Sequence, residues 1–213
     1  MILPLIIKEY VLKMLNEAST GMKAVILDDF TMNVVSAAFT QTELLQKEVF
    51  LVEKLHVNPD KNMHHLKAVC FVRPTEENIS LLCDLLKANT YSEYFFFFSH
   101  ILKETHLQAL AEADENGLVC QVQEVFASYL AVDPFLFTLD LSNNHEFLQW
   151  KTHTSHSQLN AVDRVVEGLA AFLLSVKRRP TIRHQRSSEI SRRVAEDVWR
   201  LAGAYTRSHF HLT

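Results

Sequence analysis

The chain has 213 residues, of which 48% are hydrophobic and 22% charged, and its formal net charge is −4 at pH 7. This balance is typical of a folded globular protein of one or two domains and excludes a disordered or fibrous chain. Only four glycines occur, and no two of them lie close together in the sequence. Neither GxGxxG nor GxxxxGK[ST] is therefore present, so a nucleotide enzyme with a glycine-rich phosphate loop is not expected.

The three cysteines, Cys70, Cys83 and Cys120, lie far apart within apolar segments. An odd number of isolated cysteines favours buried thiols in a reducing compartment over a disulfide framework. No basic residue precedes Lys8, so no signal peptide is expected. The longest uncharged apolar stretch of the C-terminal half, residues 168–176, has about half the length that a bilayer requires. We therefore expect a soluble chain whose contact with membranes is indirect.

The first predicted element is an amphipathic helix, because apolar residues recur at helical spacing around Lys8. The run KAVILD at residues 23–28 predicts a strand, and residues 34–39 predict a second extended segment. Thr40 and Glu43 fit a capping box, in which each side chain accepts a hydrogen bond from the backbone amide of the other residue. A short helix is therefore predicted to begin there.

Three nearly continuous apolar runs follow, as expected for strands that are buried on both faces of a sheet. These runs are residues 49–53, 68–72 and 94–98, and the pattern adds a helix from Pro74, a helix over 104–113 and a strand over 127–132. The alternation predicts an α/β fold: a three-layer, Rossmann-like domain with a mostly parallel sheet flanked by helices. We assign this domain to residues 1–133.

Beyond Pro134 the pattern changes to one strand, FLFTLDL, a polar stretch over 142–157 that predicts a loop, and two amphipathic helices. One strand and two helices cannot cover one another fully. Residues 134–213 are therefore predicted to be the start of a second α/β domain that is incomplete. We expect the helices, near 160–177 and 188–202, to have apolar faces without partners and amides that exchange fast.

Asp28 and Asp29 follow the first predicted strand, as the magnesium-binding acids of a receiver domain do. That chemistry also requires an aspartate after the central strand, where this sequence has Arg73 and Pro74. We therefore interpret the pair as solvated acids. A receiver-like or nucleotide-binding α/β enzyme is the alternative function.

No other group of residues predicts an enzyme. The eleven histidines lack partners at zinc spacing, and GxSxG is absent, so no metal or cofactor is expected. Seven basic residues lie between Lys177 and Arg193 against one acid, Glu189. Because no aromatic residue interleaves them, nucleic acid is not an expected partner. The preferred interpretation is a solvated face, or pairing with acids in a part of the second domain outside this chain.

The predicted helix over 104–113 places Leu107 and Leu110 one turn apart, and Leu118 and Val119 begin the next apolar segment. Core packing and an exposed apolar surface are both compatible with this spacing.

Four segments, QKEV, CFVRPT, LAEADE and QRSSE, follow one another in an order and at a spacing that resemble the N-terminal part of the Sec/Munc (SM) family of syntaxin-binding proteins. The resemblance covers about residues 5–202. It implies a non-enzymatic SNARE regulator in vesicle-mediated transport among Golgi, trans-Golgi network and endosomes. Its partner would be a syntaxin-type SNARE, with no homo-oligomer implied. It would be cytoplasmic and peripherally associated with those membranes.

Members of the family have three domains, so the resemblance implies the first domain and the start of the second. A truncated product without activity of its own is a further alternative. The resemblance also places a pocket for the N-terminal peptide of a syntaxin at Leu102, Leu107, Leu110, Leu118, Val119 and Glu124. It places a second, weaker surface, for the closed syntaxin bundle, at Asp28, Met32 and Glu53, beside Asn33, where neuronal members have an arginine.

Overall fold

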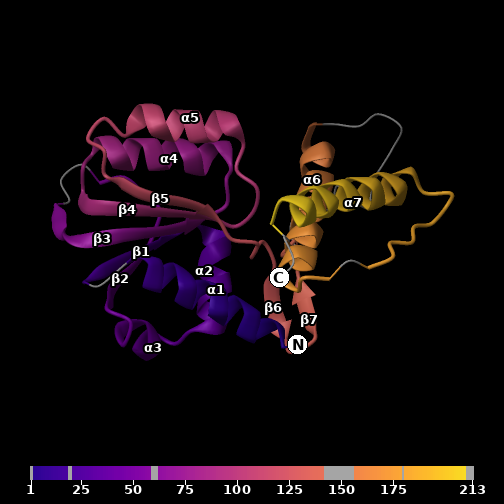
Figure 1. Cartoon of the computed structure of the whole chain (residues 1–213), viewed down its shortest axis with the longest axis horizontal. Helices are drawn as coiled ribbons and strands as arrows, with labels where there is room; N and C mark the ends of the chain where they lie inside the picture. Colours follow the sequence, from indigo (N-terminus) through magenta and orange to yellow (C-terminus); the bar gives the residue numbers. More distant parts are fainter. Residues whose placement is uncertain (1, 19–20, 59–61, 142–155, 179, 210–213) are drawn as a thin grey trace.

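A five-stranded parallel sheet forms the centre of the first part of the chain (Figure 1). The computed structural model describes residues 2–18, 21–58, 62–141, 156–178 and 180–209. The strands are β1 (Lys23–Leu27), β2 (Val49–Lys54), β3 (Met63–Val72), β4 (Tyr91–Phe98) and β5 (Val119–Glu124), in the order β2-β1-β3-β4-β5. In the strand register, Cys70 of β3 lies opposite Ile26 of β1 on one side and Phe96 of β4 on the other. The predicted α/β class with a mostly parallel sheet is confirmed.

Helices cover both faces of this sheet (Figure 1). On one face lie α1 (Leu3–Glu17), α2 (Asp29–Ala38) and the short α3 (Gln41–Leu45), and on the other lie α4 (Glu76–Lys87) and α5 (Glu104–Ala113). Strand β1 shows the resulting alternation, because Val25 and Leu27 join the core beneath α1 and α2 while Ala24 and Ile26 join the core beneath α4 and α5. Every residue of β1 is buried, which explains why the central strands are apolar without alternation.

Helix α2 corrects the prediction of an extended segment over 34–39. The Asp28 carboxylate accepts a hydrogen bond from the Thr31 amide at 2.7 Å, and the Thr31 hydroxyl accepts one from the Asp28 amide at 3.0 Å. This capping box begins a helix at Asp29. Val34 and Val35 are buried on the sheet-facing side of that helix, so burial overrides the extended preference of β-branched residues.

The other sequence predictions of this part need smaller corrections. The Thr40 capping box and the strands over 49–53, 68–72 and 94–98 are confirmed, although β3 and β4 begin earlier than predicted. The expectation that the strand over 49–53 is buried on both faces is wrong, because Phe50 and Val52 of the edge strand β2 are exposed. Helix α1 begins at Leu3, before the predicted start, and Thr75 caps α4. The strand predicted over 127–132 is the shorter β6 (Leu130–Asp133).

The second part of the chain begins with a hairpin. Strand β6 pairs antiparallel with β7 (Leu136–Thr138), and the boundary that we assign near residue 133 falls in the turn between them. Helices α6 (His156–Ser175) and α7 (Glu189–His209) follow and pack on each other. The loop predicted over 142–157 lies outside the described residues up to 155, and residues 156–157 are helical. Among the described residues, no helix has both the length and the apolar character of a membrane span.

Helix α6 packs against both α7 and the first part of the chain. Val162 and Val166 are buried with Val198 of α7, and Phe172 stacks on Phe137 with ring centroids 4.2 Å apart. Tyr129 also contacts Phe172 edge to face. The expectation that the α6 and α7 faces lack partners is therefore wrong: the two helices cover each other, and the hairpin and the first core cover another side of α6.

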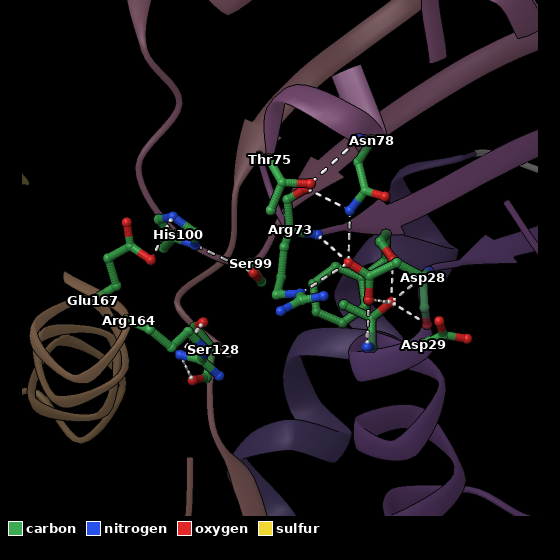
Figure 2. A network of polar contacts seen from close by, with 12 residues as sticks. Asp28, Asp29, Arg73, Thr75, Asn78, Ser99, His100, Ser128, Arg164 and Glu167 are labelled. Carbon is green, nitrogen blue, oxygen red and sulfur yellow. Dashed lines mark hydrogen bonds and ion pairs between the residues drawn. The ribbon is translucent and has the colours of Figure 1, made fainter. Parts of the chain in front are cut away.

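Polar contacts also attach α6 to the loops at the carboxyl ends of the strands (Figure 2). The Arg164 guanidinium donates to the backbone carbonyls of Ser128 and Leu139 at 3.1 and 3.2 Å. His100 Nε2 lies 3.3 Å from a Glu167 carboxylate oxygen. Gly168 permits the close approach, because a Cβ atom there would lie 2.4 Å from Cδ2 of Leu139.

Candidate functional site

An open groove of about 850 Å³ runs along the outer edge of the sheet, beside β5. Its volume lies within the roughly 300–1,000 Å³ of ligand pockets. We call it the lateral groove. It is lined by Tyr10, Lys13, Leu102, Glu104, Leu107, Val122, Gln123, Glu124, Phe126, Leu174 and Lys177. These residues come from α1, α5 and its preceding loop, β5 and its following loop, and the end of α6.

Three of the six predicted pocket residues meet in this groove. The Leu102 amide donates to a Glu124 carboxylate oxygen at 2.7 Å, which ties the loop before α5 to the end of β5. Leu107, in the second turn of α5, has 45% of its surface exposed and is an apolar side chain without core packing. Since Val122 and Phe126 line the same groove, it offers an apolar socket.

The other three predicted residues lie elsewhere. Leu110 is 2% exposed and belongs to the core beneath α4 and α5, so it cannot line an outer pocket in this conformation. Leu118 and Val119 are partly buried against the same core. Their amides donate to the Asp114 carboxylate at 2.8 and 3.0 Å, so this pair shapes the turn between α5 and β5.

Glu76 of α4 fixes the beginning of α5, which carries Leu107. Nε2 of the buried His106 lies 2.9 Å from a Glu76 carboxylate oxygen, and the Lys103 ammonium lies 3.6 Å from the same oxygen. The hydrogen bond from His106, together with its charge and that of Lys103, holds the pKa of Glu76 below its usual range. Helix α5 therefore presents Leu107 from a fixed position.

Charges of both signs line the groove. Glu104 and Glu124 belong to the α5 and β5 side, whereas Lys13 belongs to α1 and Lys177 to the end of α6. Eight lining residues were not predicted from the sequence: Tyr10, Lys13, Glu104, Val122, Gln123, Phe126, Leu174 and Lys177. Periodicity along one element cannot reveal a groove that four separate elements form.

A buried polar network lies where β1 and β3 end (Figure 2). One oxygen of Asp28 accepts from the Arg73 amide at 2.9 Å and from the Asn78 side-chain amide at 2.8 Å, and the other accepts from Thr31. Asp28 is 5% exposed, so the interpretation of a solvated acid is wrong for it. That interpretation holds for Asp29, which is exposed and pairs with a lysine.

This network lies at the carboxyl ends of β1 and β3, where the strand order reverses. Open α/β sheets usually bind their ligands at this position. Because protein donors already bond both Asp28 oxygens, its carboxylate is not arranged as that of a magnesium-binding receiver. Within the part of the chain that the structure describes, no three histidine, cysteine or acidic side chains gather as metal ligands.

Of the residues assigned to the closed-syntaxin surface, Asp28 is buried, whereas Met32 and Glu53 are partly exposed. Asp28 is engaged inside the network, and Met32 packs against the core beneath α1 and α2. Glu53 accepts a hydrogen bond from the Tyr91 hydroxyl at 2.6 Å, and Tyr91 belongs to the core on the opposite face of the sheet. Asn33 is exposed.

The strand order and the groove define a doubly wound α/β protein whose candidate site lies at an outer edge strand rather than at the usual ligand position between β1 and β3. Sequence comparison places the chain within a family. It matches the Sec1 family over residues 23–210 and belongs to that family.

The chain is similar to curated proteins named for vacuolar protein sorting. It is 43% identical over 203 residues to the vacuolar protein sorting-associated protein 45 homolog of Arabidopsis thaliana, covering 94% of this chain and 36% of that protein. It is 41% identical over 192 residues to vacuolar protein sorting-associated protein 45 of Homo sapiens, covering 90% and 32%. The chain thus spans about a third of the length of these relatives.

Solved structures agree with this placement. The SM protein Vps45 in complex with the Qa SNARE Tlg2 matches with a TM-score of 0.88 at 34% identity, covering all of this chain and 37% of that one. Sly1p in complex with an N-terminal peptide of Sed5p matches with a TM-score of 0.77 at 22% identity, covering 91% and 33%, and this second likeness concerns the fold alone.

Proposed function

We propose that the chain binds the N-terminal peptide of a syntaxin-type SNARE in the lateral groove and thereby regulates SNAREs in vesicle-mediated transport. The observation that carries the proposal is the exposed Leu107 beside Val122 and Phe126 in a groove of peptide-binding size. The similarity to Vps45, solved with the Qa SNARE Tlg2, supports this choice of partner.

The proposal makes the chain a binding protein rather than an enzyme, and it needs no cofactor. Residues 1–133 would form the peptide-binding domain, and a second domain would begin at residue 134. The protein would act in the cytoplasm at membranes of the Golgi, the trans-Golgi network and endosomes. The bound SNARE would hold it there.

Leu107→Arg tests the proposal. Burial of a leucine or phenylalanine of the peptide against Leu107 contributes about 1.5–3 kcal/mol, so the arginine is expected to weaken peptide binding roughly tenfold or more. Because Leu107 is exposed, the arginine can extend into solvent and the melting temperature should change little. Calorimetric titration with N-terminal peptides of several Qa SNAREs measures the affinity, and a thermal melt measures stability.

Leu110→Ala is the matched control, three residues further along the same helix. It removes a core side chain and should cost about 2–5 kcal/mol of stability, with little effect on the affinity of the folded fraction. A folded Leu107→Arg chain that binds every peptide as tightly as the parent would exclude the lateral groove as the peptide site.

A further inference from the structure

Lys177 ends α6 in a conformation that lysine seldom adopts. Its amide donates to the Leu174 carbonyl at 3.2 Å, and the Arg178 amide donates to the Leu173 carbonyl at 3.3 Å. These two bonds define a Schellman motif with Lys177 at the position after the helix cap, where glycine is usual. Its φ of 52° lies in the left-handed region, which disfavours any side chain with a Cβ atom.

The strained backbone places Lys177 in the lateral groove, together with Lys13 of α1. Lys177 makes no ion pair with any side chain that the structure describes, and Lys13 pairs only with Glu17, at 3.4 Å, across one helical turn. Lys13 and Lys177 are therefore the cations of the groove lining, which also includes the apolar Leu107, Val122 and Phe126. The acids Glu104 and Glu124 lie on the side of α5 and β5.

We infer that Lys177, assisted by Lys13, binds an anionic side chain of the peptide, next to the apolar residue that enters the socket. This inference rests on the proposed function and specifies its ligand: a peptide that carries a carboxylate or a phosphate beside its apolar anchor. It also makes the end of α6, in the second part of the chain, a component of the peptide site. Opposite charges on the two sides of the groove would fix the direction in which the peptide lies.

A purely structural role for Lys177 makes a different prediction. A lysine at the end of a helix interacts favourably with the helix dipole, and its removal would then alter stability without altering peptide affinity. Binding affinity and melting temperature, measured on the same variants, therefore separate the two explanations.

The experiment uses the full chain and the tightest-binding peptide from the Qa SNARE panel. Lys177→Gln is expected to weaken binding about three- to tenfold at low ionic strength, with a smaller difference at 0.5 M salt because the charges are exposed. Lys177→Arg should bind as the parent does. Lys177→Gly should bind as weakly as Lys177→Gln without a loss in melting temperature, because glycine suits the backbone there. Arg178→Gln, at the neighbouring position outside the groove, should change the affinity less than twofold.

Peptide variants identify the anion. Each acidic residue of the peptide is changed in turn to its amide, and one arm carries phosphoserine in place of the acid. We expect that the effect of Lys177→Gln disappears with one amide peptide and persists with phosphoserine. An effect confined to the phosphoserine arm would identify phosphate as the bound group.

Equal affinities of the parent and Lys177→Gln for every peptide would overturn the inference. If those affinities still depend on Leu107, the proposed function stands and only the role of Lys177 is lost. A folded parent chain that binds none of the peptides would instead refute the proposed function.

Discussion

Asp28 shows how one buried acid can hold a fold together. Its carboxylate joins the end of β1 to the beginnings of α2 and α4, through Thr31, Arg73 and Asn78. Burial alone would raise the pKa of Asp28, but hydrogen bonds from the amides of Thr31 and Arg73 and the Arg73 charge outweigh it and hold the pKa below its usual range. Asp28 is therefore ionised in the folded protein at neutral pH.

Asp28→Asn should be about 2–4 kcal/mol less stable than the parent at pH 7, because buried donors lose a charged acceptor. The depressed pKa stabilises the folded state above the unfolded pKa of about 4, and this contribution is lost as pH falls through the lower folded pKa. The free energy of unfolding should thus decline more steeply in the parent than in Asp28→Asn below about pH 5. Urea unfolding at several pH values measures both quantities.

Asp29→Asn is the matched control at the next position. Asp29 is exposed and pairs with Lys54 on the surface, so its replacement should alter stability by less than about 1 kcal/mol at any pH. A similar pH profile for Asp28→Asn and the parent would show that Asp28 does not carry the acid sensitivity.

For single residues, the sequence indicates which side chains are apolar but not which of them are exposed. Leu107 and Leu110 have the same chemistry and a helical spacing, yet one is 45% exposed and the other 2%. The difference depends on how α5 is rotated on the sheet, which Glu76 and His106 help to fix from another helix. The left-handed conformation of Lys177 could not be predicted either, because glycine is the usual sequence signal for such a helix end.

Among the elements, the strands are the best predicted and α2 the worst. Continuous apolar runs identified β1, β3 and β4, because such runs can be buried only when both faces are covered. The run at β2 also predicted a strand, but β2 lies at the edge of the sheet, and its buried or partly buried residues alternate with exposed ones. In α2 the adjacent Val34 and Val35 favoured an extended segment, and the decisive signal was the capping box at Asp28 and Thr31. A local hydrogen bond between two side chains and the backbone outweighed intrinsic propensity there.

Helix α6 depends on a close approach at Gly168. A valine there would overlap the side chain of Leu139 and press on Arg164, so Gly168→Val should cost roughly 1–3 kcal/mol. In α7, a Cβ atom at Gly203 would meet nothing within 4 Å, and Gly203→Ala should stabilise the chain by about 0.5–1 kcal/mol through helix propensity. Chemical denaturation of both variants measures these opposite shifts, and a Gly168→Val chain as stable as the parent would contradict the packing described for α6.

At the scale of the whole molecule, one core includes residues from both parts of the chain. The cluster beneath α1 and α2 contains Leu3 and Val69 and also Val176, which follows α6. The amide of Leu3 donates to the carbonyl of Pro134 at 3.0 Å, so the N-terminus is tied to the hairpin. The sequence could not predict this, because contacts between residues far apart in the chain leave no periodic pattern.

Because α6 packs into the same core as the sheet, we expect the two to unfold together. Amides of α6 between Val162 and Leu174 should exchange hydrogen within about tenfold of those in β3, through the same cooperative unfolding. Native-state hydrogen exchange read by NMR or mass spectrometry tests this. Exchange in α6 faster by a thousandfold or more would mean that α6 opens independently of the sheet.

The span of that core has a consequence for synthesis on the ribosome. Leu3 is made long before Val176, so the cluster that contains both side chains cannot be completed until the residues between them have been translated. At about 5–20 residues per second this interval lasts roughly 10–35 s. During this interval the nascent chain exposes an apolar surface that α6 later covers. Chaperones that shield such surfaces can therefore bind the nascent chain during this interval.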